Sequence, residues 1–174
     1  MYLGYAYTDS EIKEYIISAE DNLTPNGMLS IYEEAAQFGF PYLANGDVNI
    51  SGTELPQVSK NQATFSNTFY GDFGGSGWGW YGRLDYLYNS KRYAQVYNAA
   101  DTGDMERLNL RVGVANDNWT IEGWVRNATD DETSPALIRY VQVKDGNFVF
   151  GPDRAIGPTL PEKRAAGVTV GLRF

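Results

Sequence analysis

The end of the chain constrains its fold more than any other segment. Residues 163–174 alternate strictly between two kinds of side chain, as expected for a β-strand with two different faces. The apolar face carries Ala166, Val168, Val170, Leu172 and Phe174. The opposite face carries Gly167, Thr169, Gly171 and Arg173. A strand with one apolar face, one polar face and a terminal Phe is typical of an outer-membrane β-barrel, in which lipid covers one face and a lumen the other.

The same alternation predicts five further strands, which makes the expected fold class all-β and antiparallel. They cover roughly residues 2–13, 62–70, 78–89, 105–114 and 119–127. In the strand over 105–114, Leu108, Leu110, Val112 and Val114 share the apolar face. The expected polar face of these strands carries Arg83, Asp85, Arg107, Asn109, Arg111, Glu122 and Arg126. These side chains either pair across strands in the lumen or contact a ligand or a plug.

The connections between the expected strands alternate in length. Residues 71–77 and 115–118 form short turns, whereas about 14–61, 90–104 and 128–162 form long loops. This asymmetry is that of bacterial outer-membrane barrels, with short turns on the periplasmic side, so the C-terminus is expected to be periplasmic. Four aromatic residues then fall near the short turns, as membrane-interface residues do: Phe69, Trp78, Trp119 and Phe174.

The long loops carry signals of their own. Ser30 and Glu33 form a capping box that predicts a short helix over about 31–38. Around it lie Tyr32, Phe38, Phe40 and Tyr42, which form either a small core for the loop or an aromatic wall facing a ligand. Residues 136–143 and 147–150 are expected to form a hairpin beyond the membrane. Asp47 and Asn49 hint at a loop cation site, but the spacing lacks the terminal bidentate Glu of a calcium loop, and no metal site is predicted.

Composition excludes several functions. The chain has no Cys and no His, so it lacks a thiolate metal site and the commonest general base. No pairing of a nucleophile with a base is evident, so neither enzyme activity nor a cofactor is expected. The net charge is −8, and all of it arises from residues 9–54. Without a basic stripe, a nucleic-acid partner is not expected.

Six strands are too few to complete a barrel. A sheet that crosses a bilayer must close, because lipid cannot satisfy the hydrogen bonds of an open edge, and single-chain bacterial barrels begin at eight strands. Met1 is followed directly by a strand-like segment rather than by a signal peptide. Both observations lead us to expect residues 1–174 to be the C-terminal piece of a larger barrel.

Three segments support a family assignment. Residues 107–130 combine a strand, a tight turn, an aromatic start at Trp119 and an exit of the form Asn-x-x-Asp at Asn127 and Asp130. Residues 161–174 read Pro-x-x-Arg-x-x-Gly and end in Phe, and residues 52–56 read Gly-x-x-Leu-Pro. In order and spacing these motifs resemble the C-terminal region of TonB-dependent outer-membrane receptors. A second Pro, usual just after the third motif, is replaced by Val58 and Ser59.

The resemblance implies a function in active transport across the outer membrane. In that family a barrel of 22 strands encloses a plug, and a TonB box couples it to the TonB system. The ligands are scarce large molecules such as ferric siderophores, cobalamin, haem or oligosaccharides. Neither the plug nor the TonB box is recognisable in this chain. The implied partners are outer-membrane lipid and lipopolysaccharide, the remaining barrel and plug, the TonB system, and the barrel-assembly machinery, which would read Gly167 and Phe174 as a sorting signal.

Two other functions stay open at this stage. The chain could form a small standalone outer-membrane barrel, acting as a passive pore or an adhesion protein, if the long loops supplied extra strands. It could also form a soluble β-sandwich that binds carbohydrate through its aromatic side chains.

Overall fold

The structure is a computed structural model that describes residues 1–17, 48–96, 98, 100–141, 143–144, 147–148 and 154–174. Within these ranges the chain is all-β and contains no helix. No helix long and apolar enough to cross a membrane occurs in this part of the chain. The helix expected over 31–38, the aromatic residues Tyr32, Phe38, Phe40 and Tyr42, and Asp47 lie outside the described residues.

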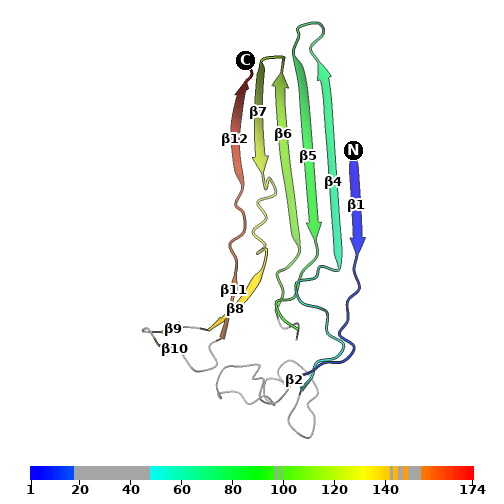
Figure 1. Ribbon diagram of the computed structural model, residues 1–174, viewed down its shortest axis with the longest axis vertical. Coiled ribbons are helices and arrows are strands. Elements are labelled where there is room, and N and C mark those ends of the chain that lie inside the picture. The colour runs from blue at the N-terminus through cyan, green and yellow to red at the C-terminus, as the bar shows by residue number, and fades with distance from the viewer. Residues whose placement is uncertain (18–47, 97, 99, 142, 145–146, 149–153) are drawn as a thin grey trace.

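One antiparallel sheet of six strands dominates the molecule, in the order β1-β4-β5-β6-β7-β12 (Figure 1). The strands are β1 (Tyr2–Tyr7), β4 (Asn61–Asp72), β5 (Gly79–Asn89), β6 (Met105–Ala115), β7 (Trp119–Arg126) and β12 (Ala165–Leu172). Each neighbouring pair is antiparallel along its whole register. The alternation in the sequence therefore predicted the number and identity of these strands correctly.

The first strand is shorter than its expected range of 2–13. β1 ends at Tyr7, and the amide of Thr8 makes one last bond to the carbonyl of Lys60 at 2.9 Å. Further on, Ile12 pairs with a different segment: its amide donates to the carbonyl of Thr53 at 2.8 Å. The polar run between these points breaks the alternation, so the chain leaves the sheet and enters the loop region.

The two ends of the sheet differ in the length of their connections. Short turns join β4 to β5 and β6 to β7 at the end that also carries the C-terminus (Figure 1). The long connections lie at the other end and contain three two-stranded sheets. These pair β2 (Ile16–Ile17) with β3 (Val48–Asn49), β8 (Leu137–Val141) with β11 (Arg154–Pro158), and β9 (Val143–Lys144) with β10 (Asn147–Phe148).

The hairpin expected from 136–143 and 147–150 is confirmed only in part, because Val143 pairs with Phe148 but most of the first segment has another partner. Residues 137–141 bond to residues 154–158, and the shorter pair β9 and β10 lies between them in sequence. The sequence pattern misled because several short apolar runs follow each other here, and alternation alone does not identify which of them pair. The hairpin nevertheless belongs to the long-loop end and adds no strand to the main sheet.

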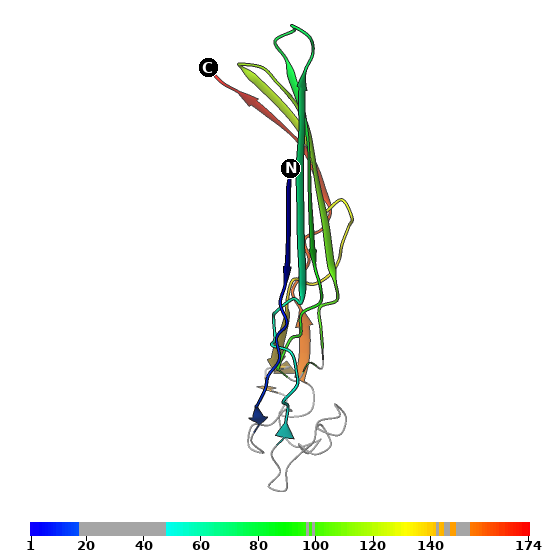
Figure 2. The ribbon, with the colours of Figure 1, turned by 90° about the vertical axis from the view of Figure 1, so that its right-hand side faces the viewer.

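The sheet is a single curved layer, as Figure 2 shows from the side. The register places the apolar residues of neighbouring strands opposite each other: Leu84 faces Leu110, and Leu110 faces Val125. Among the described residues only Ile50 and Met105 are buried hydrophobic side chains, and both lie towards the long-loop end. No second sheet or helix of the described residues packs on either face. Val112 on β6 and Val168 on the edge strand β12, both on the apolar face, are 65% and 72% exposed.

Both edges of the sheet are open. β1 pairs only with β4, and β12 pairs only with β7 among the described strands. The backbone groups on the outer sides of these two strands are therefore available to further strands.

Candidate functional site

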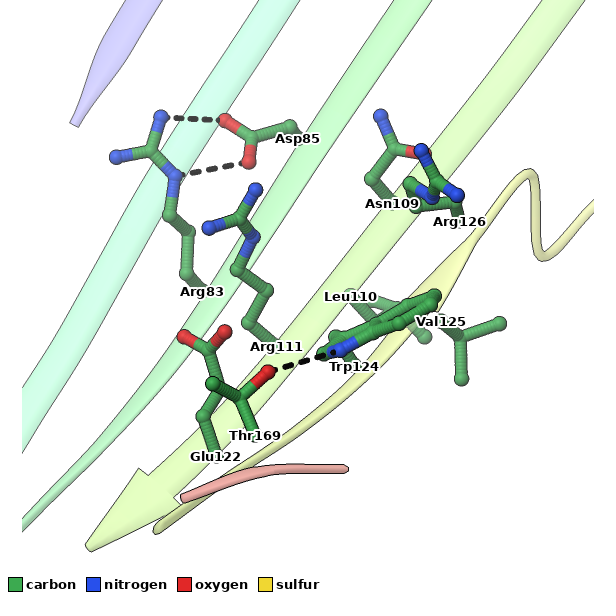
Figure 3. A pocket seen from close by; sticks show the side chains of 10 residues that line it. All are labelled: Arg83, Asp85, Asn109, Leu110, Arg111, Glu122, Trp124, Val125, Arg126 and Thr169. Carbon is green, nitrogen blue, oxygen red and sulfur yellow. Dashed lines mark hydrogen bonds and ion pairs between the residues drawn. The ribbon is translucent and has the colours of Figure 1, made fainter. Parts of the chain in front are cut away.

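The polar face of the sheet contains a hollow of about 710 Å³ that spans β5, β6, β7 and β12 (Figure 3). Its lining consists of Arg83, Asp85, Asn109, Leu110, Arg111, Glu122, Trp124, Val125, Arg126 and Thr169. Most of these are polar side chains at alternate positions of adjacent strands. The strand pattern had placed all of the charged members on this face, and the register confirms that placement.

Most charges in the hollow are paired with groups of the chain itself. Arg83 and Asp85 form a two-pronged ion pair, with Nε to Oδ2 at 2.8 Å and Nη2 to Oδ1 at 2.7 Å. Asp85 also accepts a hydrogen bond of 2.6 Å from the hydroxyl of Ser66 on β4. Glu122 accepts a bond of 2.6 Å from the hydroxyl of Tyr81. The two hydroxyl bonds join different strands, whereas the Arg83–Asp85 ion pair lies within β5 and is not one of the cross-strand charge pairs that the sequence predicted.

A second group of ion pairs closes the hollow towards the long loops. Glu162, in the segment leading to β12, lies 3.4 Å from Arg126 and 3.7 Å from Arg107. The guanidinium carbon of Arg126 also lies 5.1 Å from the ring centre of Trp124, within cation–π range. One carboxylate thus fixes two arginines on neighbouring strands.

Two aromatic rings lie flat over glycines on this face. A Cβ atom at Gly113 would lie 2.6 Å from the Tyr81 ring, and one at Gly167 would lie 2.5 Å from the Trp124 ring. In both pairs the glycine stands directly opposite the aromatic residue in the register. The indole NH of Trp124 then reaches the hydroxyl of Thr169 at 3.3 Å. Gly167 thus has a packing role that the sequence did not reveal, in addition to its expected role in assembly.

Arg111 differs from the other charged groups of the hollow. It stands directly opposite Arg83 on the neighbouring strand, and its side chain is exposed. Within the described part of the chain it forms neither an ion pair nor a side-chain hydrogen bond, whereas the other two arginines of the hollow are both paired with carboxylates. Among the described residues, Arg111 is thus the one arginine of the hollow without an ion pair, and Glu122 is the one carboxylate of the hollow without an ion pair.

The opposite face is apolar and contains a second hollow, of about 610 Å³. It lies where Gly82 and Gly123 alternate with Phe69 and Val112 along one row of the register. Because Gly82 and Gly123 have no side chains, a groove remains between the larger side chains of Phe69 and Val112. A flexible apolar chain could fill it, but the described residues do not.

The four proposed interface aromatics all lie in the half of the sheet nearest the short turns. Trp78 directly precedes β5 and Trp119 begins β7, at the two short turns. Phe69 lies further inside β4, opposite Gly82, and is 60% exposed. Phe174, beyond the end of β12, is fully exposed. Their assignment to a membrane interface remains a prediction.

At the other end of the sheet, the two most specific motifs are in direct contact. Asn127 is 1% exposed, with φ at +48°, a value that Asn tolerates better than most residues. Its side-chain amide donates to the carbonyls of Asp131, at 2.9 Å, and Glu162, at 2.7 Å. Asp130 forms an ion pair with Arg164 at 3.3 Å. The Asn-x-x-Asp motif follows β7 and the Pro-x-x-Arg motif precedes β12. Their contacts therefore hold the two strands together at the long-loop end of the sheet, like a clamp.

Asp131 extends this clamp to β6. Its carboxylate accepts hydrogen bonds from the backbone amides of Glu106 and Thr133, the second at 2.6 Å. Burial is the largest single effect and acts to raise the pKa of Asp131, but the two amide donors, the Thr133 side chain and the charge of Arg107 together outweigh it, so the pKa lies below the ordinary value of 3.8. The carboxylate is therefore the form that the fold stabilises.

The third motif also has a structural role. Gly52 has φ at +91°, which favours glycine, and the hydroxyl of Thr53 donates to the carbonyl of Ile50 at 2.9 Å. The side chain of Asn98 bridges to the backbone of Glu54, accepting from its amide at 2.6 Å and donating to its carbonyl at 2.9 Å. The motif therefore shapes the chain just before β4 and ties it to the loop after β5.

The described residues contain no cluster of three or more His, Cys, Asp or Glu side chains that could hold a metal ion. Sequence reasoning missed the stacking of Tyr81 and Trp124 on glycines and the clamp around Asn127. Their only sequence signals are lone glycines in strands and an Asn at a strand exit, which become informative once the register is known. Comparison with protein-family models, with curated proteins and with solved structures finds no match for this chain.

Proposed function

We propose that this chain forms the C-terminal six strands of a TonB-dependent outer-membrane receptor, which takes up a scarce large ligand. One observation carries the proposal: a single-layered antiparallel sheet has one long apolar face that no described residue covers. In water such a face would be costly, at about 25 cal/mol for each Å² of apolar surface. Lipid on that face removes this cost.

The open edges support a larger barrel. Both β1 and β12 have one unpaired side among the described strands, and a bilayer provides no solvent for unpaired backbone groups. The short strands of the loop region pair with each other and not with the main sheet. The described residues therefore supply six spanning strands, fewer than the eight of the smallest single-chain barrels, which disfavours a standalone pore.

The polar face supports a lumen filled by water, ligand or plug. Most of its charges are paired and partly exposed, an arrangement that suits an aqueous interior and not a hydrocarbon one. The contacts of Asn127 with Glu162 and of Asp130 with Arg164 bring together two of the segments on which the family resemblance rests. The soluble sandwich is disfavoured because no second sheet among the described residues covers the apolar face.

Fractionation of cells that produce the tagged protein tests the membrane assignment. We expect the protein in the outer-membrane fraction, resistant to carbonate extraction and soluble only with detergent. Recovery in the soluble fraction would contradict the assignment.

A second experiment tests the receptor assignment separately. We expect the transcript that carries this coding sequence to encode a plug domain in the same reading frame. Membrane insertion by a polypeptide without a plug would favour the standalone barrel.

Deleting Phe174 in the same protein is expected to lower outer-membrane levels, because the terminal aromatic would be read by the barrel-assembly machinery.

A further inference from the structure

We propose that the apolar face around Asn67 is an interface at which a second copy of this protein binds within the membrane. The two copies are joined by hydrogen bonds between their Asn67 amides, beside the glycine-lined groove of the same face. This inference rests on the proposed function, because the amide lacks water as a partner only if lipid covers this face.

Asn67 is a polar side chain in the middle of the apolar face. It lies on β4 opposite Leu84, and Leu84 in turn lies opposite Leu110, so the three residues share one row across the sheet. Leu84 and Leu110 are the central residues of β5 and β6. Along the same face of β4, the neighbours of Asn67 are Phe65 and Phe69. An amide therefore lies among apolar side chains at the centre of the sheet.

The side chain of Asn67 forms no hydrogen bond with any described residue. The preceding residue, Ser66, donates to Asp85 on the polar face, and the alternation of the strand directs Asn67 to the other side. Leu84, in the same row, lies about 17 Å along the strand from either end of β5, so an Asn side chain at this depth does not reach the lipid headgroups. Lipid tails neither donate nor accept hydrogen bonds, which makes an unbonded amide costly here. A protein group that bonds to the amide removes this cost.

A second copy supplies the matching group, because an amide is complementary to itself. Its nitrogen donates and its oxygen accepts, so two Asn67 side chains related by a two-fold axis each donate one hydrogen bond and accept one. Membrane-spanning helices associate by the same means, through hydrogen bonds between polar side chains and through small residues that allow close approach.

The surface beside Asn67 is also complementary to itself in shape. Phe69 is 60% exposed on β4, and directly opposite it lies Gly82, which lines the groove of about 610 Å³. A Cβ atom at Gly82 would have no other atom within 4 Å, so the groove is open to an incoming side chain. In a two-fold pair, the ring of Phe69 from each copy fits the groove of the other. One surface thus supplies both the projecting ring and the recess.

Energy transfer between labelled copies of the full protein in lipid vesicles measures this association. The chain contains no Cys, so Asp117→Cys provides one labelling site, in the short turn between β6 and β7 and away from Asn67. We expect transfer in the unaltered protein that falls as lipid dilutes it. Asn67→Leu removes the amide and is expected to weaken the association at least tenfold. Asn67→Gln keeps an amide and should associate more tightly than Asn67→Leu.

Gly82→Val tests the groove independently of the amide. The added side chain meets no atom of its own sheet, but it fills the recess and is expected to weaken the association. Thr68→Leu is the matched control, because Thr68 is the exposed neighbour of Asn67 on the polar face and should leave the association unchanged. Flotation of the vesicles and heat-modifiable migration in gels verify that each variant is inserted and folded.

Three results would overturn the proposal: no transfer in the unaltered protein, unchanged association in Asn67→Leu, or an equal loss in Thr68→Leu. Association through the open edges of the sheet would give the second of these, and lipid in the groove would give the first. A monomer inserted in the vesicles would leave the membrane assignment intact. Failure of the unaltered protein to insert would contradict the proposed function, and this inference with it.

Discussion

At the scale of single residues, a substitution of Leu110 tests which face of the sheet contacts lipid. It is the middle residue of β6, opposite Leu84 on one side and Val125 on the other. We expect Leu110→Arg to destabilise the folded protein in lipid by about 2–4 kcal/mol, since a charge would then face hydrocarbon near the midplane. Unfolding by denaturant in lipid vesicles measures the change.

Thr64→Arg is a suitable control on the polar face. Thr64 lies on β4 between Gly4 and Leu87 in the register, where no charge opposes it. A similar change at Asn109 would be a poor control, because Asn109 holds the backbone amide of Asn127. We expect Thr64→Arg to be nearly neutral, and equal losses in both variants would refute the assignment of the two faces.

At the scale of elements, the stacking of Trp124 on Gly167 holds β12 against β7. Gly167→Ala would place a methyl group 2.5 Å from the indole and force the ring to move. We expect a loss of about 1–3 kcal/mol in stability, typical of an overpacked site. Gly171→Ala is the matched control on the same face of β12, since its methyl would lie 3.8 Å from the Cβ of Thr120.

A second substitution separates packing from assembly. If the ring causes the loss, Trp124→Ala should remove most of the penalty of Gly167→Ala in a double-mutant cycle. Equal losses at Gly167 and Gly171, with no relief from Trp124→Ala, would instead indicate that any alanine in this strand impairs the protein.

The clamp at the strand exits is expected to depend on pH. The folded pKa of Asp131 lies below its ordinary value of 3.8, so its carboxylate contributes stability above that value. The contribution is lost as the pH falls below 3.8 and through the lower pKa of the folded protein, because the acid must then be protonated. Hydrogen exchange at the amide of Glu106, corrected for its intrinsic pH dependence, should therefore accelerate at low pH. In Asp131→Asn this dependence should be absent, and its persistence would contradict the role given to the carboxylate.

Sequence alternation predicted the elements of this fold well, because each strand of a two-faced sheet must repeat its pattern every second residue. Strands β4 to β7 and β12 end within about two residues of their expected bounds, and the charged residues of the hollow lie on the expected face. Pairings in the loops were harder to predict, as the wrong partner of residues 137–141 shows. The stacking of Trp124 on Gly167 depends on which residues stand opposite each other, and one strand read alone does not contain that information.

At the scale of the whole molecule, the account rests on what covers the apolar face. The described residues bury almost no hydrophobic side chains, so the sheet has no core of its own. Its stability must come from strand pairing and from whatever lies against that face. Lipid on one side and a lumen on the other would explain both the open edges and the charge on a single face.

Nitroxide scanning along β6 tests this claim most directly. The chain contains no Cys, so single cysteines introduced at positions 107–112 would each carry the only label. For the protein in lipid vesicles, we expect labels at Leu108, Leu110 and Val112 to be accessible to oxygen dissolved in the bilayer. Labels at Arg107, Asn109 and Arg111 should respond instead to a water-soluble nickel reagent. A water-soluble reagent that reached all six positions equally, or oxygen accessibility without alternation, would contradict the account.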